Sequence, residues 1–344
     1  MAYKVVIADT VFGNDDIEQR LFAESGLDVA CVYLRSRDPA ELIRQAATAQ
    51  AVTLAETLLP RPMIEQLTSC RVIVRYGIGV DAVDLRAATD HGIIVCNTAR
   101  YCLDEVSTHA VTLLLMLNRS IPANTARLRA GEWFSPTVPV RRLAGQQLGV
   151  VGIGNIGREV ARKALGLGLR VVACDPYVQR LPDDVQSVRL IGLEELLAGS
   201  DYVSLHVPLN ATTRHLIGDR ELRLLKPSAF LINTARGPVV DQAALTDALA
   251  TGRLAGAGLD VFEREPLPAD DPLRRLDNVI LTPHAAHWSE EASVDCRETA
   301  VAHVLSVLRG ELPGDIVNAE VLQSANRRSV AVTTESTSRH GGGW

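Results

Sequence analysis

The stretch from Gly152 to Gly157 reads Gly-Ile-Gly-Asn-Ile-Gly, a pattern that can hold a phosphate group. An apolar, strand-like run precedes it and a helix-like run follows it, and this setting makes the pattern informative. Gly152 permits the tight turn, Gly154 lets the backbone approach a pyrophosphate, and Gly157 allows the helix to pack closely on the strand. The amides near Asn155 and Ile156 would bind the diphosphate at the positive end of the helix. The pattern therefore predicts a dinucleotide-binding site.

An acidic residue in the following strand indicates which dinucleotide would bind. Asp175 closes the predicted strand 170–174, eighteen residues after Gly157. Its carboxylate would accept hydrogen bonds from the adenosine ribose hydroxyls and would repel a 2′-phosphate. Arg180 is the one nearby cation in the sequence that could weaken this repulsion. We therefore expect NAD rather than NADP as the cofactor.

Three further side chains could do chemistry together. Arg236, Glu265 and His284 each lie just after a predicted strand in the second half of the chain. Open α/β sheets place their ligands at the carboxyl ends of the strands, so these residues are expected to converge beside the nicotinamide. Each residue alone could be an ordinary surface or loop residue, and the joint placement favours a catalytic site.

The elements that must position these residues alternate between strands and helices, which predicts parallel sheets covered on both faces. The sequence therefore predicts an α/β protein with two Rossmann-like or flavodoxin-like domains. The strands expected in the first domain are 5–8, 29–33, 51–54, 72–75 and 93–96. Those expected in the second are 147–151, 170–174, 202–206, 230–233, 256–260 and 279–282.

The last predicted helix, 290–309, has no strand after it, so we expect it to return to the first domain. This gives a discontinuous substrate-binding domain of residues 1–103 and 290–322, with the NAD-binding domain 104–289 inserted in it. The remaining residues, 323–344, are rich in Ser, Thr, Arg and Gly, a composition typical of a disordered tail.

Composition narrows the class of protein. The 344 residues are 47% hydrophobic and carry a net charge of −6, which disfavours a nucleic-acid surface. No apolar run has the length of a membrane span, and the N-terminus lacks the pattern of a signal peptide. The six cysteines are scattered without a C-x-x-C pair, so we expect free thiols and no metal site. These features predict a cytoplasmic metabolic protein.

Taken together, the motifs resemble the D-isomer-specific 2-hydroxyacid dehydrogenase family over roughly residues 1–320. Segments 101–106 and 288–291 are most similar to its C-terminal-binding-protein-like and phosphoglycerate-dehydrogenase-like branch. Besides the glycine pattern, the matching motifs are Arg75-Tyr-Gly-Ile-Gly-Val-Asp81, His206-Val-Pro208, Asn233-Thr-Ala-Arg-Gly237, Gly258-Leu-Asp260, Glu265-Pro266 and Pro283-His284.

This resemblance implies an NAD-dependent enzyme that moves a hydride between nicotinamide and C2 of a small D-2-hydroxy or 2-keto acid. His284 would be the acid and base, and Glu265 would bind and orient its imidazole. Arg236 would bind the substrate carboxylate and polarise the C2 carbonyl through its planar fork. The amides of Ile78 and Gly79 would hold the carboxylate from the first domain, with closure of the domains excluding water.

The resemblance also assigns other contacts. Asp260 is expected to contact the nicotinamide carboxamide, and residues 206–208 to line its ribose. The full set of expected cofactor-binding residues is Gly152, Gly154, Asn155, Ile156, Gly157, Asp175, Pro176, His206, Val207, Pro208, Thr213, Thr234, Ala235, Arg236, Asp260, His284 and Ala286. The expected substrate-binding residues are Tyr76, Gly77, Ile78, Gly79, Arg236, His284 and His287.

Two positions depart from the family pattern. His287 stands where the C-terminal-binding-protein pattern has Trp, which could place an extra hydrogen-bond donor near the substrate. Ala82 stands where Asn is usual, a change that concerns the local turn. The substrate side chain would be set by the loops 76–78, 101–103 and 133–139, and spacing does not define their shapes.

Other functions stay open. One is an NAD(H)-sensing regulatory protein of the C-terminal-binding-protein type, although a pure sensor needs no catalytic acid. Another is oxidation of phosphite or of a phosphonate substrate. Formate oxidation is disfavoured because the histidine partner in that enzyme is usually Gln and here is Glu265. The family also implies a homodimer through the NAD-binding domain, with 111–117 and 121–130 as candidate interface helices.

Overall fold

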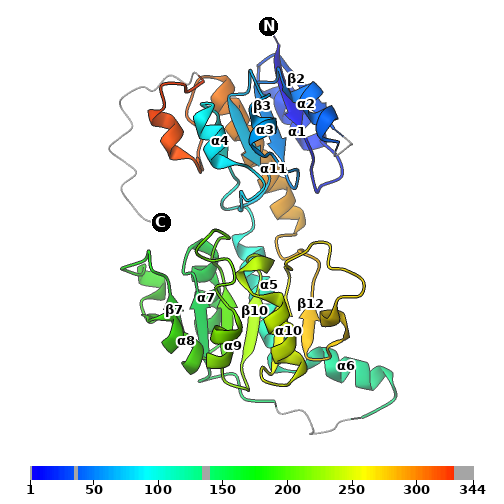
Figure 1. The fold of residues 1–344 in the computed structure, drawn as a ribbon, viewed down its shortest axis with the longest axis vertical. Helices are drawn as coiled ribbons and strands as arrows, with labels where there is room; N and C mark the ends of the chain where they lie inside the picture. Colours follow the sequence, from blue (N-terminus) through cyan, green and yellow to red (C-terminus); the bar gives the residue numbers. More distant parts are fainter. Residues whose placement is uncertain (1, 35–37, 134–139, 329–344) are drawn as a thin grey trace. The chain divides into compact units, whose positions relative to one another are not determined.

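A computed structural model describes residues 2–34, 38–133 and 140–328, and it divides the chain into two compact units. Among the described residues, unit 1 comprises 2–34, 38–101 and 289–328, and unit 2 comprises 102–133 and 140–288. Each unit holds one sheet of parallel strands with helices on it (Figure 1), which confirms the predicted α/β class. The loop 133–139 expected to shape the substrate site lies, after Trp133, outside the described residues.

Unit 1 contains a five-stranded sheet in the order β2-β1-β3-β4-β5. Its strands are β1 (Tyr3–Ile7), β2 (Val29–Tyr33), β3 (Ala51–Leu54), β4 (Val72–Arg75) and β5 (Ile94–Cys96). Its helices are α1 (Asp16–Glu24), α2 (Pro39–Ala46), α3 (Arg61–Ile64), α4 (Leu85–Asp90) and α11 (Glu290–Leu308).

Side chains alternate across this sheet and fill two separate cores. Val5 and Ile7 join the core beneath α1 and α11, whereas Val6 joins the core beneath α2, α3 and α4. Because successive residues of a strand point to opposite faces, a sheet covered on both sides needs a continuous apolar run. This requirement explains the sequence Tyr-Lys-Val-Val-Ile of β1.

The chain returns to unit 1 through α11 and a short 3-10 helix, η4 (Ala319–Gln323). Residues 324–328, which composition assigned to a disordered tail, continue along this unit. Arg328 donates a hydrogen bond to the carbonyl of Cys70 at 3.0 Å and another to that of Leu67. The boundary expected at residue 322 is too early, because these contacts with distant backbone atoms leave no mark in the composition.

Unit 2 contains a seven-stranded sheet in the order β12-β11-β10-β9-β6-β7-β8. Its strands are β6 (Gln147–Val151), β7 (Arg170–Cys174), β8 (Arg189–Leu190), β9 (Tyr202–Leu205), β10 (Phe230–Asn233), β11 (Gly256–Leu259) and β12 (Val279–Leu281). Its α-helices are α5 (Leu103–Asn118), α6 (Ile121–Arg129), α7 (Asn155–Gly166), α8 (Leu193–Gly199), α9 (Asp219–Leu224) and α10 (Gln242–Ala250).

The parallel arrangement of these strands places the candidate site residues at the carboxyl ends of the strands. All neighbouring strands are parallel, so the segments that follow β6, β10, β11 and β12 leave the sheet at the same edge. Helix α5 packs on β11 so closely that a Cβ at Gly258 would lie 2.9 Å from that of Leu113. Within the described residues, no helix is long and apolar enough to cross a membrane.

Candidate active site

The glycine turn after β6 has the geometry that its sequence predicts. Gly152 has φ +89°, and a Cβ there would lie 2.8 Å from the backbone of His206. A Cβ at Gly157 would overlap the carbonyl oxygen of Gly152, so α7 can approach β6 only because this residue is glycine. At Gly154, by contrast, a Cβ would have no described heavy atom within 4 Å. The backbone at Gly154 is therefore open to a ligand.

Asp175 stands beside this turn at the end of β7. Its carboxylate accepts hydrogen bonds from the amides of Ile153 and Tyr177, both at 3.0 Å. Pro176 lies in the turn that follows β7. Asn155 and Ile156 are the first residues of α7. Gly154, the N-cap of α7, provides no side-chain hydrogen bond to the helix. The first amides of α7 therefore remain available to an anion.

Arg236 lies in a loop that Asn233 holds in place after β10. The side-chain amide of Asn233 accepts a hydrogen bond from the backbone amide of Ala235 and donates one to the Arg236 carbonyl, both at 3.0 Å. A Cβ at Gly237 would overlap the carbonyl group of Phe262, so this loop packs directly against the segment that leads to Glu265. The guanidinium of Arg236 donates to the Ala235 carbonyl at 2.7 Å.

His284 and Glu265 form a hydrogen-bonded pair. Nδ1 of His284 lies 2.7 Å from Oε2 of Glu265, and the other oxygen of Glu265 accepts from the Phe262 amide at 2.9 Å. Burial raises the pKa of Glu265, but the hydrogen bond and charge of His284, the Phe262 amide and the charge of Arg236 outweigh burial and leave the pKa below its ordinary value. The carboxylate is thus ionised at neutral pH and faces the imidazole.

Asp260, which is expected to contact the nicotinamide, is held by several hydrogen bonds directly after β11. Its side chain is buried, and its two oxygens accept hydrogen bonds from Thr282 Oγ1 at 2.6 Å and from the Ala285 and Ala286 amides at 3.0 and 2.9 Å. Its carbonyl also accepts from the His284 amide at 2.8 Å. These bonds hold both sides of His284, whose backbone is left-handed at φ +54°. Asp260 therefore fixes the backbone around His284, and Ala286 is one of its partners.

A histidine from α5 extends this network. Nε2 of His109 lies 3.0 Å from Thr282 Oγ1. Because Thr282 donates its proton to Asp260, the hydroxyl accepts a hydrogen bond from His109. Sequence patterns alone do not reveal this partner. The close approach of α5 to the end of β12 creates it.

The segment after β9 carries the remaining cofactor residues. Nε2 of His206 lies 2.8 Å from Ser204 Oγ, and burial lowers the pKa of His206 to about 3. Val207 packs against the core of unit 2. The hydroxyl of Thr213 donates to the Pro208 carbonyl at 2.6 Å, which closes the loop. His206 is therefore a neutral residue beside the glycine turn.

The expected substrate residues of unit 1 form a turn after β4. Gly77 has φ +132°, and its amide donates to Thr98 Oγ1 at 2.8 Å. Asn97 donates to the Ile78 carbonyl at 2.6 Å. The sequence singled out the turn from Tyr76 to Gly79 but not these two anchors. Both directly follow the predicted strand 93–96, so the strand-end rule could have found them.

In unit 2, the ring of His287 lies 6.2 Å from that of His284 in an edge-on arrangement. It thus stands next to the candidate acid, as its spacing suggests. Thr234, expected near the cofactor, has a buried hydroxyl with no hydrogen-bond partner among the described residues. An unpaired buried hydroxyl, the open backbone at Gly154 and the exposed start of α7 fit a polar cofactor such as NAD.

Comparisons with known proteins agree with this arrangement. Residues 111–286 match the family model described as D-isomer specific 2-hydroxyacid dehydrogenase, NAD binding domain. A glyoxylate reductase of Korarchaeum cryptofilum is 40% identical over 276 residues, which cover 79% of this chain and 83% of the relative. The chain belongs to the D-isomer-specific 2-hydroxyacid dehydrogenase family.

Other members of the family extend the match. A D-3-phosphoglycerate dehydrogenase of Methanocaldococcus jannaschii is 39% identical over 280 residues, or 81% of this chain and 53% of the relative. The structure of a D-lactate dehydrogenase from Aquifex aeolicus, complexed with NAD and lactic acid, has 28% identity and a TM-score of 0.81. It covers 92% of this chain and 99% of the neighbour. This dehydrogenase is thus an NAD-dependent oxidoreductase, as the sequence predicted.

Proposed function

We propose that this dehydrogenase reduces glyoxylate and similarly short 2-keto acids with NADH, with His284 as the proton donor. The pair of His284 and Glu265 carries the proposal, because a carboxylate 2.7 Å from one ring nitrogen leaves the other nitrogen to serve the substrate. Curated relatives named glyoxylate reductase, between 36% and 40% identical to this chain, support the choice of substrate.

The reaction involves the cofactor and two side chains, His284 and Glu265. Bound NADH supplies the hydride that adds to C2 of the keto acid. His284 donates the proton on Nε2 to the carbonyl oxygen, which becomes the hydroxyl of the product. Glu265 keeps its hydrogen bond to Nδ1 throughout and so holds the ring in one orientation. In the oxidation of a hydroxy acid, neutral His284 takes the proton back.

The substrate carboxylate needs partners of opposite charge and fixed direction. Arg236 offers a planar fork of donors. The hydrogen bonds of the Asn233 side chain hold its loop at the end of β10. In unit 1, the amides of Ile78 and Gly79 would provide donors for a carboxylate. Asp175 would bind the adenosine ribose and select NAD over NADP.

A substrate panel tests this proposal. NADH oxidation should be observed with glyoxylate and with short 2-keto acids, and should be weaker with NADPH. Arg236→Lys keeps the charge but loses the fork, so the KM for glyoxylate should rise with less effect on NADH affinity. If NADH binds tightly but no 2-keto acid is reduced, a sensor of the cofactor is the better description. Turnover of phosphite with NAD would instead favour a phosphite dehydrogenase.

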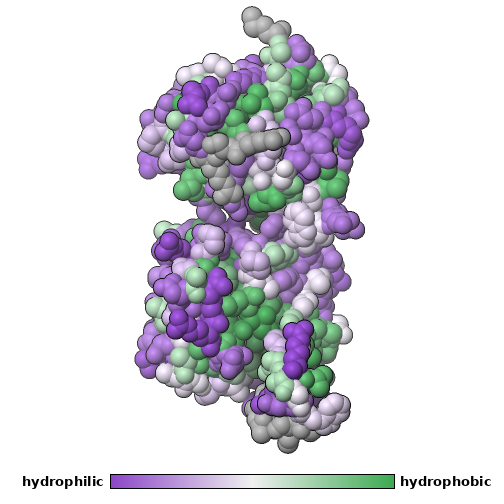
Figure 2. Space-filling view, turned by 90° about the vertical axis from the view of Figure 1, so that its right-hand side faces the viewer, coloured by the Kyte–Doolittle hydropathy of each residue, from purple (hydrophilic) through white to green (hydrophobic). Residues whose placement is uncertain are grey.

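We also propose that two copies of the chain associate through unit 2. No residue of α6 is buried, although the helix carries Ile121 and Leu128, which are 47% and 59% exposed. Figure 2 shows hydrophobic side chains distributed over the surface of this unit. A helix that exposes two large aliphatic side chains and buries no residue is suited to pack against a second copy.

A further inference from the structure

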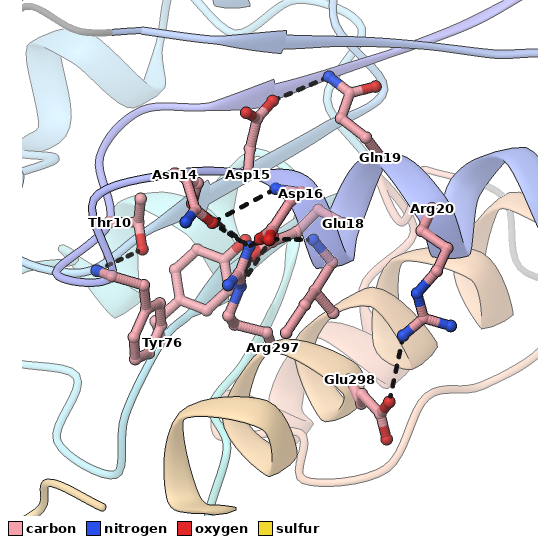
Figure 3. Close-up of polar contacts among 12 residues, drawn as sticks. Thr10, Asn14, Asp15, Asp16, Glu18, Gln19, Arg20, Tyr76, Arg297 and Glu298 are labelled. Atoms are coloured by element: carbon pink, nitrogen blue, oxygen red, sulfur yellow. Dashed lines mark hydrogen bonds and ion pairs between the residues drawn. The ribbon is translucent and has the colours of Figure 1, made fainter. Parts of the chain in front are cut away.

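Two adjacent residues of α11 reach the turn that we assign to the substrate carboxylate. Arg297, which is hydrogen-bonded to Glu18 of α1 (Figure 3), approaches Tyr76, the first residue of the turn, through the ring of Phe12. Cys296 approaches Gly77 through Thr98. One helix of the C-terminal segment thus supports two successive residues of a turn in the N-terminal segment.

The first connection is an ion pair inside the protein. Arg297 is 4% exposed and Glu18 is 1% exposed. Nε of Arg297 donates to the two oxygens of Glu18 at 3.0 and 2.9 Å, and Nη2 donates to Glu18 at 2.5 Å and to Asp16 at 2.7 Å. Burial lowers the pKa of Arg297, but its bonds to these carboxylates more than offset burial and raise the pKa overall. Arg297 therefore stays charged.

Tyr76 is fixed by the same cluster. Its hydroxyl accepts a hydrogen bond from Thr53 Oγ1 at 3.2 Å, and its ring meets Phe12 edge-on at 5.9 Å. The guanidinium of Arg297 lies 5.6 Å from the centre of the Phe12 ring. Burial raises the pKa of Tyr76 well above its ordinary value, and the charge of Glu18 raises it further. The hydroxyl thus remains protonated.

The second connection holds the backbone. Thr98 Oγ1 lies 3.3 Å from the sulfur of Cys296 and accepts the Gly77 amide at 2.8 Å. The Thr98 amide in turn donates to the Gly77 carbonyl at 3.2 Å. With Tyr76 held at the ring and Gly77 held at both backbone groups, the direction of the next amides, those of Ile78 and Gly79, is set.

We propose that Glu18 and Arg297 are positioning residues for the carboxylate-binding turn; this inference rests on the proposed function of that turn. Stability alone does not require them, because an apolar pair of similar volume is commonly as stable as a buried ion pair. The same two helices are already joined by an exposed pair, Arg20 and Glu298, with N and O 3.7 Å apart. That pair lies outside the Tyr76 cluster and provides a matched control (Figure 3).

The experiment compares Arg297→Lys and Tyr76→Phe with Glu298→Gln in the full-length protein. Arg297→Lys keeps the charge but loses the fork, and Tyr76→Phe removes one hydroxyl with little effect on packing. Each should raise the KM for glyoxylate by about five- to tenfold, the effect of one or two lost hydrogen bonds, while the Kd for NADH changes less than twofold. Glu298→Gln should leave both constants unchanged.

Hydrogen exchange of the backbone amides in residues 76–80 provides a second measurement. Exchange should be faster in both test variants than in Glu298→Gln, with the amides of unit 2 unaffected. Equal exchange in all three proteins, or an equal rise in the KM for glyoxylate and the Kd for NADH, would overturn the inference. The exchange result decides it even if the wild type reduces no 2-keto acid, an outcome that would refute the proposed function alone.

Discussion

His284 has a close counterpart in the same unit, which makes its role testable at the scale of single residues. His215 is also left-handed, with φ +51° against +54° for His284. It too has a ring nitrogen 2.7 Å from a glutamate, in this case Glu263. The two pairs differ in their surroundings, since Asp260, which follows β11, holds the backbone of His284 but not that of His215. Comparing variants of the two histidines shows whether catalysis depends on where the pair lies or on the presence of any histidine–glutamate pair.

Replacement of the candidate acid should remove catalysis without removing the cofactor. His284→Ala should lower kcat for glyoxylate by about 10²–10⁴, the range for loss of a general acid. NADH binding, measured by fluorescence, should change little. His215→Ala should keep kcat close to that of the wild type. An equal loss in both variants would show that the pair at His284 is structural.

His206 should affect the pH dependence of stability. Its folded pKa of about 3 lies below the ordinary value of 6.5, so at pH 5 the unfolded chain binds a proton that the folded chain does not. The folded state therefore loses stability as the pH falls, by about 2 kcal/mol between pH 7 and pH 5 from this residue. In urea unfolding, His206→Asn should lose correspondingly less over this range. The same loss in variant and wild type would contradict the pKa shift.

At the scale of elements, α7 contains two glycines with opposite requirements. Gly157 must lack a Cβ because the Gly152 carbonyl occupies its place, whereas a Cβ at Gly166 would have no described atom within 4 Å. The helix thus needs one glycine for its docking on β6 and not the other. The motif pattern in the sequence marks Gly157 but says nothing of Gly166.

The two sites should respond in opposite directions to alanine. Gly157→Ala should displace α7 from the glycine turn, weakening NADH binding at least tenfold and lowering the melting temperature. Gly166→Ala should raise stability by up to about 1 kcal/mol, because alanine favours the helix. Calorimetry and NADH titration of both variants measure these effects. Unchanged NADH affinity in Gly157→Ala would argue against the turn as the diphosphate site.

Sequence patterns predict the buried strands of this fold well. The bounds of β2, β3, β4, β6, β7 and β10 match the expected ranges, because a strand covered on both faces is an apolar run that ends at turn residues. The two-residue edge strand β8 (Arg189–Leu190) has no such run and was not expected. Edge strands need few apolar residues, so they leave a weak signal.

The candidate site was predictable in its motifs but not in its supports. The glycine turn and the three candidate catalytic side chains stand at strand ends, which a sequence shows. Residue types alone do not specify which backbone groups the folded loops present. The burial of Asp260 and the hydrogen bonds from Asn97 and Thr98 to the turn after β4 depend on those groups. The ion pair of Arg297 with Glu18 joins residues 279 positions apart.

At the scale of the whole molecule, surface composition suggests association. Each unit has its own sheet and its own cores, so neither needs a second copy to bury its strands. Helix α6 is different, since it contributes no buried residue to unit 2 and exposes two large aliphatic side chains. Apolar surface of this kind is typical of subunit interfaces.

Light scattering should therefore give a mass of about 74 kDa, twice the 37.1 kDa of one chain. Placing charge on α6 with the double variant Ile121→Glu and Leu128→Glu should shift the protein toward monomer. Leu58→Glu, an equally exposed position of unit 1, should not. A wild type that is monomeric at micromolar concentration would refute the interface.

The discontinuity of unit 1 has a consequence for biosynthesis. The carboxylate of Glu18 leaves the ribosome long before Arg297, which becomes its partner inside the finished core. During translation, unit 2 can complete its sheet first, while the N-terminal strands wait without α11 on one face. Nascent chains that stop short of α11 should thus expose a partly covered sheet with an unneutralised acid, and chaperones that recognise apolar surface should bind them at this stage.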